Sequence, residues 1–104
     1  MAADGTLILT RSDVVALLGL EECIAAVEEA FRLHGEGQAA PPGVLALHSA
    51  EGAFHIKAGI LGSSRPYFVA KGNTNFAANP QRFGLPAIQG VIVMCDAVDG
   101  RLLA

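Results

Sequence analysis

Lys71 is the side chain with the clearest chemical consequence, because it stands in an otherwise uncharged, strand-like run at residues 67–76. An ammonium group on a half-buried strand needs an anionic or polar partner, or it loses its proton. No acidic residue lies between Glu51 and Asp96, so no carboxylate close in sequence can neutralise Lys71. The partner could therefore be an acidic ligand.

Other polar side chains fall at spacings that could bring them next to this lysine. Residues two apart on a strand project from the same face. His55 and Lys57 therefore share a face of one predicted strand, and Lys71, Asn73 and Asn75 share a face of the next. If the two strands are neighbours, these rows merge into one substrate-binding site. Otherwise they form an ordinary solvated face.

Gln89 is a further candidate for substrate binding, because a buried glutamine on its predicted strand would need partners for its amide. Arg82 could reach a ligand anion or an acidic partner from the Pro- and Gly-bracketed loop at residues 79–86, which we interpret as structural. Ser63 and Ser64 lack the signature of an activated nucleophile.

The histidines and cysteines form no recognisable metal-binding pattern. His34 lies on the apolar stripe of a predicted helix, where a packed histidine is expected, and His48 ends a strand with no nearby partner in sequence. Cys23 and Cys95 have no C-x-x-C spacing, and we interpret them as reduced core residues. The sequence predicts no metal site.

The charges divide unevenly along the chain. Residues 1–36 carry seven acidic and two basic side chains, whereas residues 37–95 carry four basic and one acidic. Four separated cations with few aromatic residues among them suit the tracking of a phosphate backbone poorly. We therefore predict no nucleic-acid partner and favour a small anion, such as a carboxylate, as the ligand.

The composition indicates one small domain with a partner. A chain of 104 residues is about one domain long, and 52% hydrophobic with 16% charged residues is rich in apolar surface for that length. The longest apolar runs, such as residues 90–95, are too short to cross a bilayer, and the N-terminus lacks a basic segment followed by an apolar one. We predict a cytoplasmic, oligomeric protein without a membrane partner.

Two helices are predicted before the strands. Thr10 and Asp13 can cap each other's backbone at the start of a short helix that runs through Leu18. A longer amphipathic helix follows and ends at Gly35 and Gly37.

Alternating apolar residues then predict strands at residues 44–49, 53–61, 67–75 and 88–96. The apolar group at residues 7–9 and a strand launched by the hairpin turn at residues 97–100 would add to them. The expected fold class is α+β, with two N-terminal helices packed on a mixed or antiparallel β-sheet of five to six strands. The last strand has barely begun to pair at residue 104, which predicts a piece of a longer protein.

Several of these motifs together resemble the N-terminal part of the ornithine cyclodeaminase and mu-crystallin family. The most specific of them is the G-L-P-x-x-Q-G-V run that starts at Gly84 and continues to Gly100, and the strand lysine Lys71 comes second. Pro41-Pro42 and the run at residues 52–57 add to the likeness, which covers nearly the whole chain.

The resemblance implies that residues 1–104 are a single domain, the first part of a substrate-binding and dimerisation domain that a Rossmann domain holding NAD follows. Lys71 matches the family lysine that contacts the substrate carboxylate and the reacting carbon. It could also take part in proton transfer, since a desolvated lysine gives up its proton more readily. Family members cyclise ornithine, reduce cyclic imines, oxidise alanine or bind thyroid hormone. The G-x-G-x-x-G fingerprint is absent, so we expect this chain alone to bind no NAD.

Two positions depart from the family pattern. Gly43 stands where many members carry an arginine that clamps the substrate carboxylate, and His55-Ile-Lys57 stands where ornithine cyclodeaminases tend to have Glu-Leu-Met. Lys57 could replace the missing cation, but both departures weaken ornithine as the substrate.

The leading hypothesis is the substrate-binding and dimerisation part of a cyclodeaminase-like, NAD-dependent enzyme that acts on a small amino or imino acid and is inactive alone. In it Lys71 is catalytic, and the substrate-binding residues are Lys57, His55, Asn73 and Gln89. The alternative is a non-catalytic domain that forms a homodimer through its sheet and binds a small carboxylate.

Overall fold

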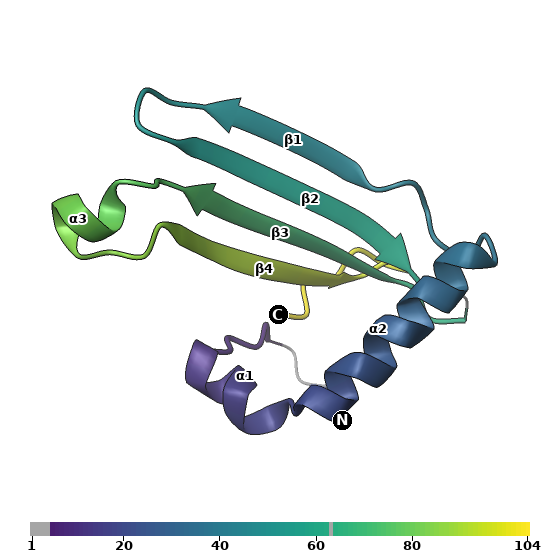
Figure 1. Cartoon of the computed structure of the whole chain (residues 1–104). Coiled ribbons are helices and arrows are strands. Elements are labelled where there is room, and N and C mark those ends of the chain that lie inside the picture. Colours follow the sequence, from purple (N-terminus) through teal and green to yellow (C-terminus); the bar gives the residue numbers. More distant parts are fainter. Residues whose placement is uncertain (1–4, 63) are drawn as a thin grey trace.

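A computed structural model describes residues 5–62 and 64–104 and has an α+β architecture (Figure 1). The elements in chain order are α1 (Arg11–Leu17), α2 (Leu20–Gly35), β1 (Gly43–His48), β2 (Ala53–Leu61), β3 (Tyr67–Asn75), α3 (Asn79–Phe83) and β4 (Ile88–Asp96). The strands form one sheet in the order β1-β2-β3-β4, and every neighbouring pair is antiparallel. The predicted bounds of the last three strands are confirmed.

The described part of the chain has four strands, and the expectation of five to six is wrong. The two additional segments pair only briefly. Leu7 N–H donates to Leu103 O at 2.9 Å, and residues 101–104 fold back on the end of β4 through Asp96 N–H to Arg101 O at 2.9 Å and Leu103 N–H to Met94 O at 2.8 Å, around a single bridge between Cys95 and Leu102. The predicted hairpin turn is present, since Gly100 N–H donates to Asp96 O at 2.9 Å and Gly100 has a φ of 77°. Neither segment pairs over enough consecutive residues to form a strand.

The short helix α1 begins at the predicted reciprocal cap. Asp13 N–H donates to Thr10 Oγ1 at 3.2 Å, and Thr10 N–H donates to Asp13 Oδ2 at 2.8 Å. The hydrogen bonds from the Thr10 backbone and hydroxyl to its carboxylate hold the pKa of Asp13 below its usual value. Local sequence therefore decides where this helix starts.

The longer helix α2 is the only described helix that contacts a strand of the sheet, and that strand is β2. Its half-buried side chains include Cys23, Ala30 and Leu33. Most of the predicted apolar stripe is nevertheless exposed, namely Leu20, Ile24, Val27 and Phe31. The expected packing of two helices on the sheet is therefore only partly confirmed, because the described residues leave this stripe uncovered.

Strand register sorts the sheet residues into two faces. The polar face carries His48, His55, Lys57, Lys71, Asn73 and Asn75. The apolar face carries Leu45, Leu47, Phe54, Ile56, Ile60 and Val91, all of them exposed. The charged side chains of the sheet therefore lie on the polar face, which also carries the exposed apolar residues Val44, Ile88 and Ile92.

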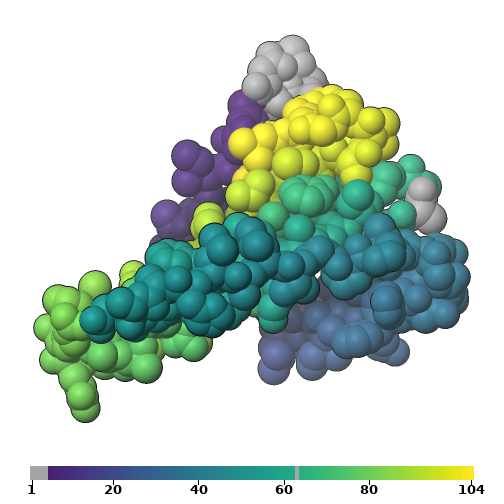
Figure 2. Space-filling model, turned by 90° about the horizontal axis from the view of Figure 1, so that it is seen from above, coloured from purple at the N-terminus to yellow at the C-terminus, as the bar shows by residue number. Residues whose placement is uncertain are grey.

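No apolar side chain of the described residues is fully buried. The chain exposes 8087 Å², whereas a compact monomer of this length exposes roughly 5,500 Å². Its radius of gyration is 16.2 Å, compared with about 13 Å for a compact domain. Figure 2 shows the elongated shape, with α3 (green) at the narrow end and α2 (blue) at the broad end. So much open apolar surface favours association with another protein surface.

Candidate functional site

Lys57 and Lys71, the only lysines of the chain, lie directly opposite each other across the antiparallel pair β2–β3. Side chains in such a position share a face, and their Cβ atoms are about 5 Å apart. We call these two residues the lysine row. Like charges placed directly opposite each other destabilise a sheet, so an anion bound between the two ammonium groups would relieve their repulsion.

The next row of the polar face supplies hydrogen-bonding groups. His55 lies opposite Asn73, and both side chains are half-buried. The ring of His48 approaches the ring of His55 edge-on, with the centroids 6.5 Å apart. Imidazole and amide groups can both donate and accept hydrogen bonds. The register meets the condition set by the sequence analysis, since β2 and β3 are neighbours and their polar rows lie side by side.

Lys71 is exposed, although Gly72 and Asn73 beside it are half-buried. In the part of the chain that the structure describes, neither lysine forms a salt bridge with a carboxylate. The half-buried strand expected at Lys71 therefore does not shelter this side chain within the described residues, because no second layer covers its row. The described residues do not supply the desolvation on which proton transfer by this lysine depends.

An apolar hollow of about 510 Å³ lies next to the lysine row. Its floor is the following row of the same face, with Gly59, Val69 and Met94, and its wall includes His34 of α2 and Pro42 of the connection to β1. Two residues along a strand separate this floor from the lysine row, or about 7 Å. The volume is within the range of small-molecule sites.

Carboxylates near the two ends of the sheet are held by other groups. Asp96 has 7% of its surface exposed, accepts a hydrogen bond from Val98 N–H at 2.8 Å and lies 3.6 Å from the guanidinium of Arg65. Glu51 accepts a hydrogen bond from Arg82 at 2.9 Å, which confirms an acidic partner for that arginine. Neither carboxylate is available to the lysine row.

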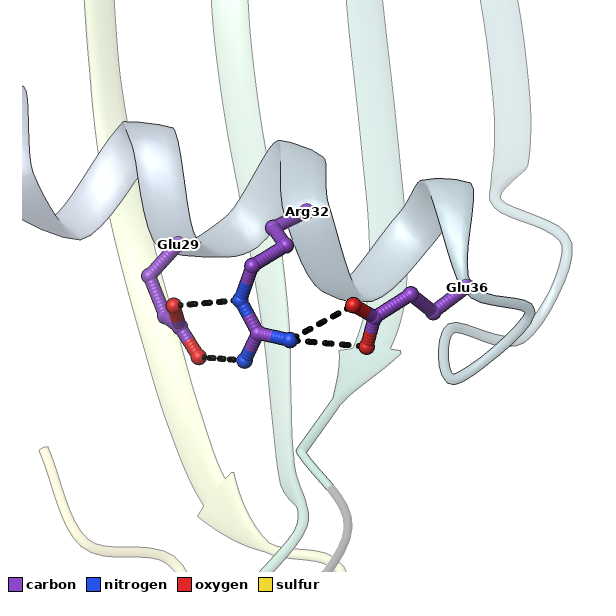
Figure 3. Close-up of polar contacts among 3 residues, drawn as sticks. All are labelled: Glu29, Arg32 and Glu36. Carbon is purple, nitrogen blue, oxygen red and sulfur yellow. Dashed lines mark hydrogen bonds and ion pairs between the residues drawn. The ribbon is translucent and has the colours of Figure 1, made fainter.

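The acidic residues around the end of α2 are also occupied (Figure 3). Arg32 binds Glu29 three residues before it, and its Nη1 lies 2.7 Å from Glu36 four residues after it. The hydrogen bond from Arg32 holds the pKa of Glu29 below its usual value, and its two carboxylate partners raise the pKa of Arg32. This cluster is exposed, and its arginine is shared by two carboxylates.

Gln89 does not join the other candidate residues. It is exposed and lies opposite Thr74 on the apolar face. Its strand neighbour Gly90 lies opposite Asn73 on the polar face, because successive residues of a strand point to opposite sides. The grouping of Gln89 with the lysines in one site is therefore incorrect within the described structure.

His48 is a polar-face residue for which the sequence offered no partner. It reaches His55 because β1 and β2 form a hairpin, in which Ser49 N–H donates to Gly52 O at 2.9 Å. The Ser49–Gly52 turn between two alternating strands was the signal that could have predicted this contact. His34 was expected to be packed, and it lines the hollow instead.

Within residues 5–62 and 64–104, no group of three or more His, Cys, Asp or Glu side chains could hold a metal ion. Cys23 and Cys95 are free and only half-buried. None of the described helices is long and apolar enough to cross a membrane. Ser63 lies outside the described residues.

These residues also do not fit NAD. A dinucleotide needs a glycine-rich turn between a parallel strand and a helix, whose N-terminus takes the pyrophosphate. The sheet here is antiparallel throughout, and the sequence has no G-x-G-x-x-G. We assign no NAD contact to the described part of the chain.

Residues 4–104 match the sequence model of the ornithine cyclodeaminase/mu-crystallin family. Alanine dehydrogenase of Archaeoglobus fulgidus is 33% identical over 100 residues, which are 95% of this chain and 30% of the relative. A solved archaeal alanine dehydrogenase dimer with bound NAD matches with a TM-score of 0.86 at 32% identity, over 95% of this chain and 30% of that one.

Two further solved structures are similar. Thermococcus litoralis Delta(1)-pyrroline-2-carboxylate reductase, in complex with NADH and L-proline, has a TM-score of 0.79 at 26% identity and matches over 92% of this chain and 30% of its own. A lysine cyclodeaminase that recognises L-lysine, L-ornithine and L-2,4-diaminobutyric acid has a TM-score of 0.62 at 26% identity, over 95% and 31% of the two chains. The chain thus spans about a third of the length of these relatives.

Proposed function

The chain belongs to the ornithine cyclodeaminase/mu-crystallin family, and from that premise we propose that residues 1–104 form a single domain that supplies the substrate-binding and dimerisation surfaces of an NAD-dependent enzyme acting on a small amino or imino acid. The relatives named with NAD or NADH are about three times longer than this chain. In this proposal the cofactor is held by protein outside the described residues, and only substrate contacts are assigned to them.

The observation that carries the proposal is the lysine row beside the apolar hollow. Lys71 and Lys57 project from one face without a salt-bridge partner in the described residues, and the hollow two residues further along is large enough for a small molecule. A carboxylate bound by Lys71 gains a charge-assisted hydrogen bond, which is stronger than a neutral one. The apolar wall suits the carbon skeleton of the same ligand.

The class of substrate is supported by chemistry and by the relatives. Amino acids and their imino or oxo counterparts all carry an α-carboxylate, the group that an ammonium on a strand can fix in position. The similar solved structures are an alanine dehydrogenase, a reductase in complex with L-proline, and a lysine cyclodeaminase that recognises L-lysine and L-ornithine. In this proposal Lys71 contacts the substrate carboxylate, Lys57 lies beside it, and His55 and Asn73 complete the polar wall.

Dimerisation is assigned to the apolar face. Its exposed residues, such as Leu45, Ile56 and Val91, form a broad surface without a charged side chain. One of the similar structures is described as a dimer. A second copy that packs on this face would remove its apolar area from water, which is the main favourable term in protein association.

The test is binding of pyruvate, a small carboxylate, to the purified protein and to its Lys71→Met variant by isothermal titration calorimetry. We expect the variant to lose most of the affinity, while Arg11→Met, which removes a cation from exposed α1, leaves it unchanged. Equal affinity of wild type and Lys71→Met would remove Lys71 from the site. A longer form that binds pyruvate yet shows no NADH-dependent turnover of any amino or imino acid would favour the alternative of a non-catalytic carboxylate-binding dimer.

A further inference from the structure

The polar face presents two lysine side chains that have no acidic side chain near them in the described residues. β2 and β3 contain no acidic residue, and β4 contains only Asp96, in the row of Tyr67 and four residues along β3 from Lys71. Asp96 is engaged by Arg65 and by the turn that follows β4. A ligand on the lysine row therefore meets two positive charges that nothing in the described structure compensates.

The two uncompensated lysines predict that the affinity of a ligand depends on how many acidic groups it carries. A monocarboxylate neutralises one of the two ammonium groups and leaves the other opposite it unsatisfied. A diamino acid, such as those recognised by the similar lysine cyclodeaminase, would bring two further ammonium groups next to the two lysines. A dicarboxylate supplies one anion for each lysine. Complementary charge increases affinity, and like charge opposes the wrong ligand.

We propose that Lys57 and Lys71 together make this site selective for a substrate with two acidic groups, an amino, imino or oxo dicarboxylate. The inference rests on the proposed function, since it takes the α-carboxylate to be held by Lys71, and it adds that the second acidic group is held by Lys57. Lys57 is a specificity-determining residue in this assignment.

The positions of the neighbouring rows agree with such a ligand. The lysine row runs across the strands, so a ligand that contacts both ammonium groups lies across β2 and β3 and not along them. The apolar floor at Gly59 and Val69 adjoins the row on one side, and the half-buried pair His55 and Asn73 adjoins it on the other. The carbon skeleton can therefore rest on the apolar side while amino or imino nitrogen and oxygen atoms meet the imidazole and amide.

The presence of only two lysines allows a direct test. Reductive methylation with carbon-13 formaldehyde labels both lysines and the N-terminal amine and preserves their charge. Lys57→Met and Lys71→Met assign the two lysine signals, and the signal that remains in both variants is that of the N-terminal amine. The labelled protein is titrated with 2-oxoglutarate (two carboxylates), pyruvate (one carboxylate) and L-ornithine (one carboxylate and two amines). Calorimetry on the unlabelled protein gives the affinities, and Arg11→Met is the charge-matched control.

We expect 2-oxoglutarate to shift both lysine signals and to bind roughly five- to tenfold more tightly than pyruvate, with L-ornithine the weakest ligand. Lys57→Met should bring 2-oxoglutarate to within about twofold of pyruvate, and Arg11→Met should leave the order unchanged. Equal affinities for the two oxo acids, tightest binding of L-ornithine, or a preference for 2-oxoglutarate that survives Lys57→Met would overturn the inference. If pyruvate binding still depends on Lys71 in those cases, the proposed function stands; if it does not, both fail.

Discussion

Gly90 lies opposite Asn73 across β3–β4 at a distance that leaves no space for a side chain on the glycine. A Cβ at Gly90 would come within 2.8 Å of Gly72 O and 3.2 Å of Asn73 Cβ, and both atoms belong to a paired strand that cannot move independently. This glycine therefore allows β4 to approach the polar face beside Asn73, which belongs to the candidate site.

We expect Gly90→Ala to lower the free energy of unfolding by about 2 kcal/mol, since the added methyl group must displace backbone. Gly59→Ala is the matched control, because Gly59 also lies in a strand and a Cβ there meets no atom within 4 Å. Urea denaturation of both variants measures the two free energies of unfolding. A Gly90→Ala protein as stable as the control would show that β3 and β4 are not paired in this register.

The lysine row predicts an increase in stability when one lysine is removed. Replacing Lys57 by Met should raise the free energy of unfolding of the ligand-free protein by about 0.5 kcal/mol, because like charges opposite each other on a sheet repel. This gain in stability should become smaller at high salt, because added ions screen the repulsion between the two lysines. The Debye length is about 10 Å at 0.1 M salt and becomes shorter as the salt concentration rises. Denaturation at low and high salt measures both effects. A gain that is independent of salt would attribute the effect to the apolar replacement and not to charge.

The cap of α1 predicts a pH-dependent helix. The folded-state pKa of Asp13 is lowered by its hydrogen bonds to Thr10, so its stabilising contribution is present above the unfolded value, about 3.9, and is lost as the pH falls through the lower folded value. Asp13→Asn should therefore weaken α1 at neutral pH and match the wild type in strong acid. Thr10→Ala removes the hydroxyl acceptor and should cost about 1 kcal/mol.

Amide hydrogen exchange at Val14 and Leu18 measures the stability of α1 directly. The Val14 amide donates to Thr10 O at the start of the helix, and the Leu18 amide donates to Val14 O at its end. Glu51→Gln, in an exposed ion pair remote from α1, is the control for a general effect of removing a carboxylate. Equal exchange in Asp13→Asn and wild type at neutral pH would contradict a capping role.

The apolar face predicts the assembly state. Ile56→Glu places a charge at the centre of this face, opposite Leu45, and we expect it to convert a dimer to a monomer because burial of an unpaired carboxylate is costly. Val98→Glu adds the same charge at an exposed turn residue outside the sheet and should leave the dimer intact. Light scattering after size-exclusion chromatography measures the molar mass of both variants and therefore their assembly state. A dimer that survives Ile56→Glu would move the interface to another surface, with the exposed stripe of α2 as the next candidate.

The sequence by itself determined the local features of this protein. The Thr10–Asp13 cap, the bounds of β2, β3 and β4, and the turn at Gly100 were predicted correctly, because each depends on a few adjacent residues: a reciprocal hydrogen bond, an alternation of period two, and a glycine with a positive φ. The same alternation placed His55 with Lys57 and Lys71 with Asn73. It also contained the information that Gln89 and Gly90 face opposite sides.

Only the tertiary structure decided which residues meet and which are covered. Lys57 lies opposite Lys71, and His48 reaches His55, because of the register between the strands. That register depends on the geometry of the connecting turns, so the sequence of one strand alone does not determine it. The tertiary structure also decides which side chains are exposed. Lys71 and the apolar stripe of α2 are exposed because no second layer of the described residues covers them. An amphipathic pattern indicates that a face can be covered but does not specify what covers it.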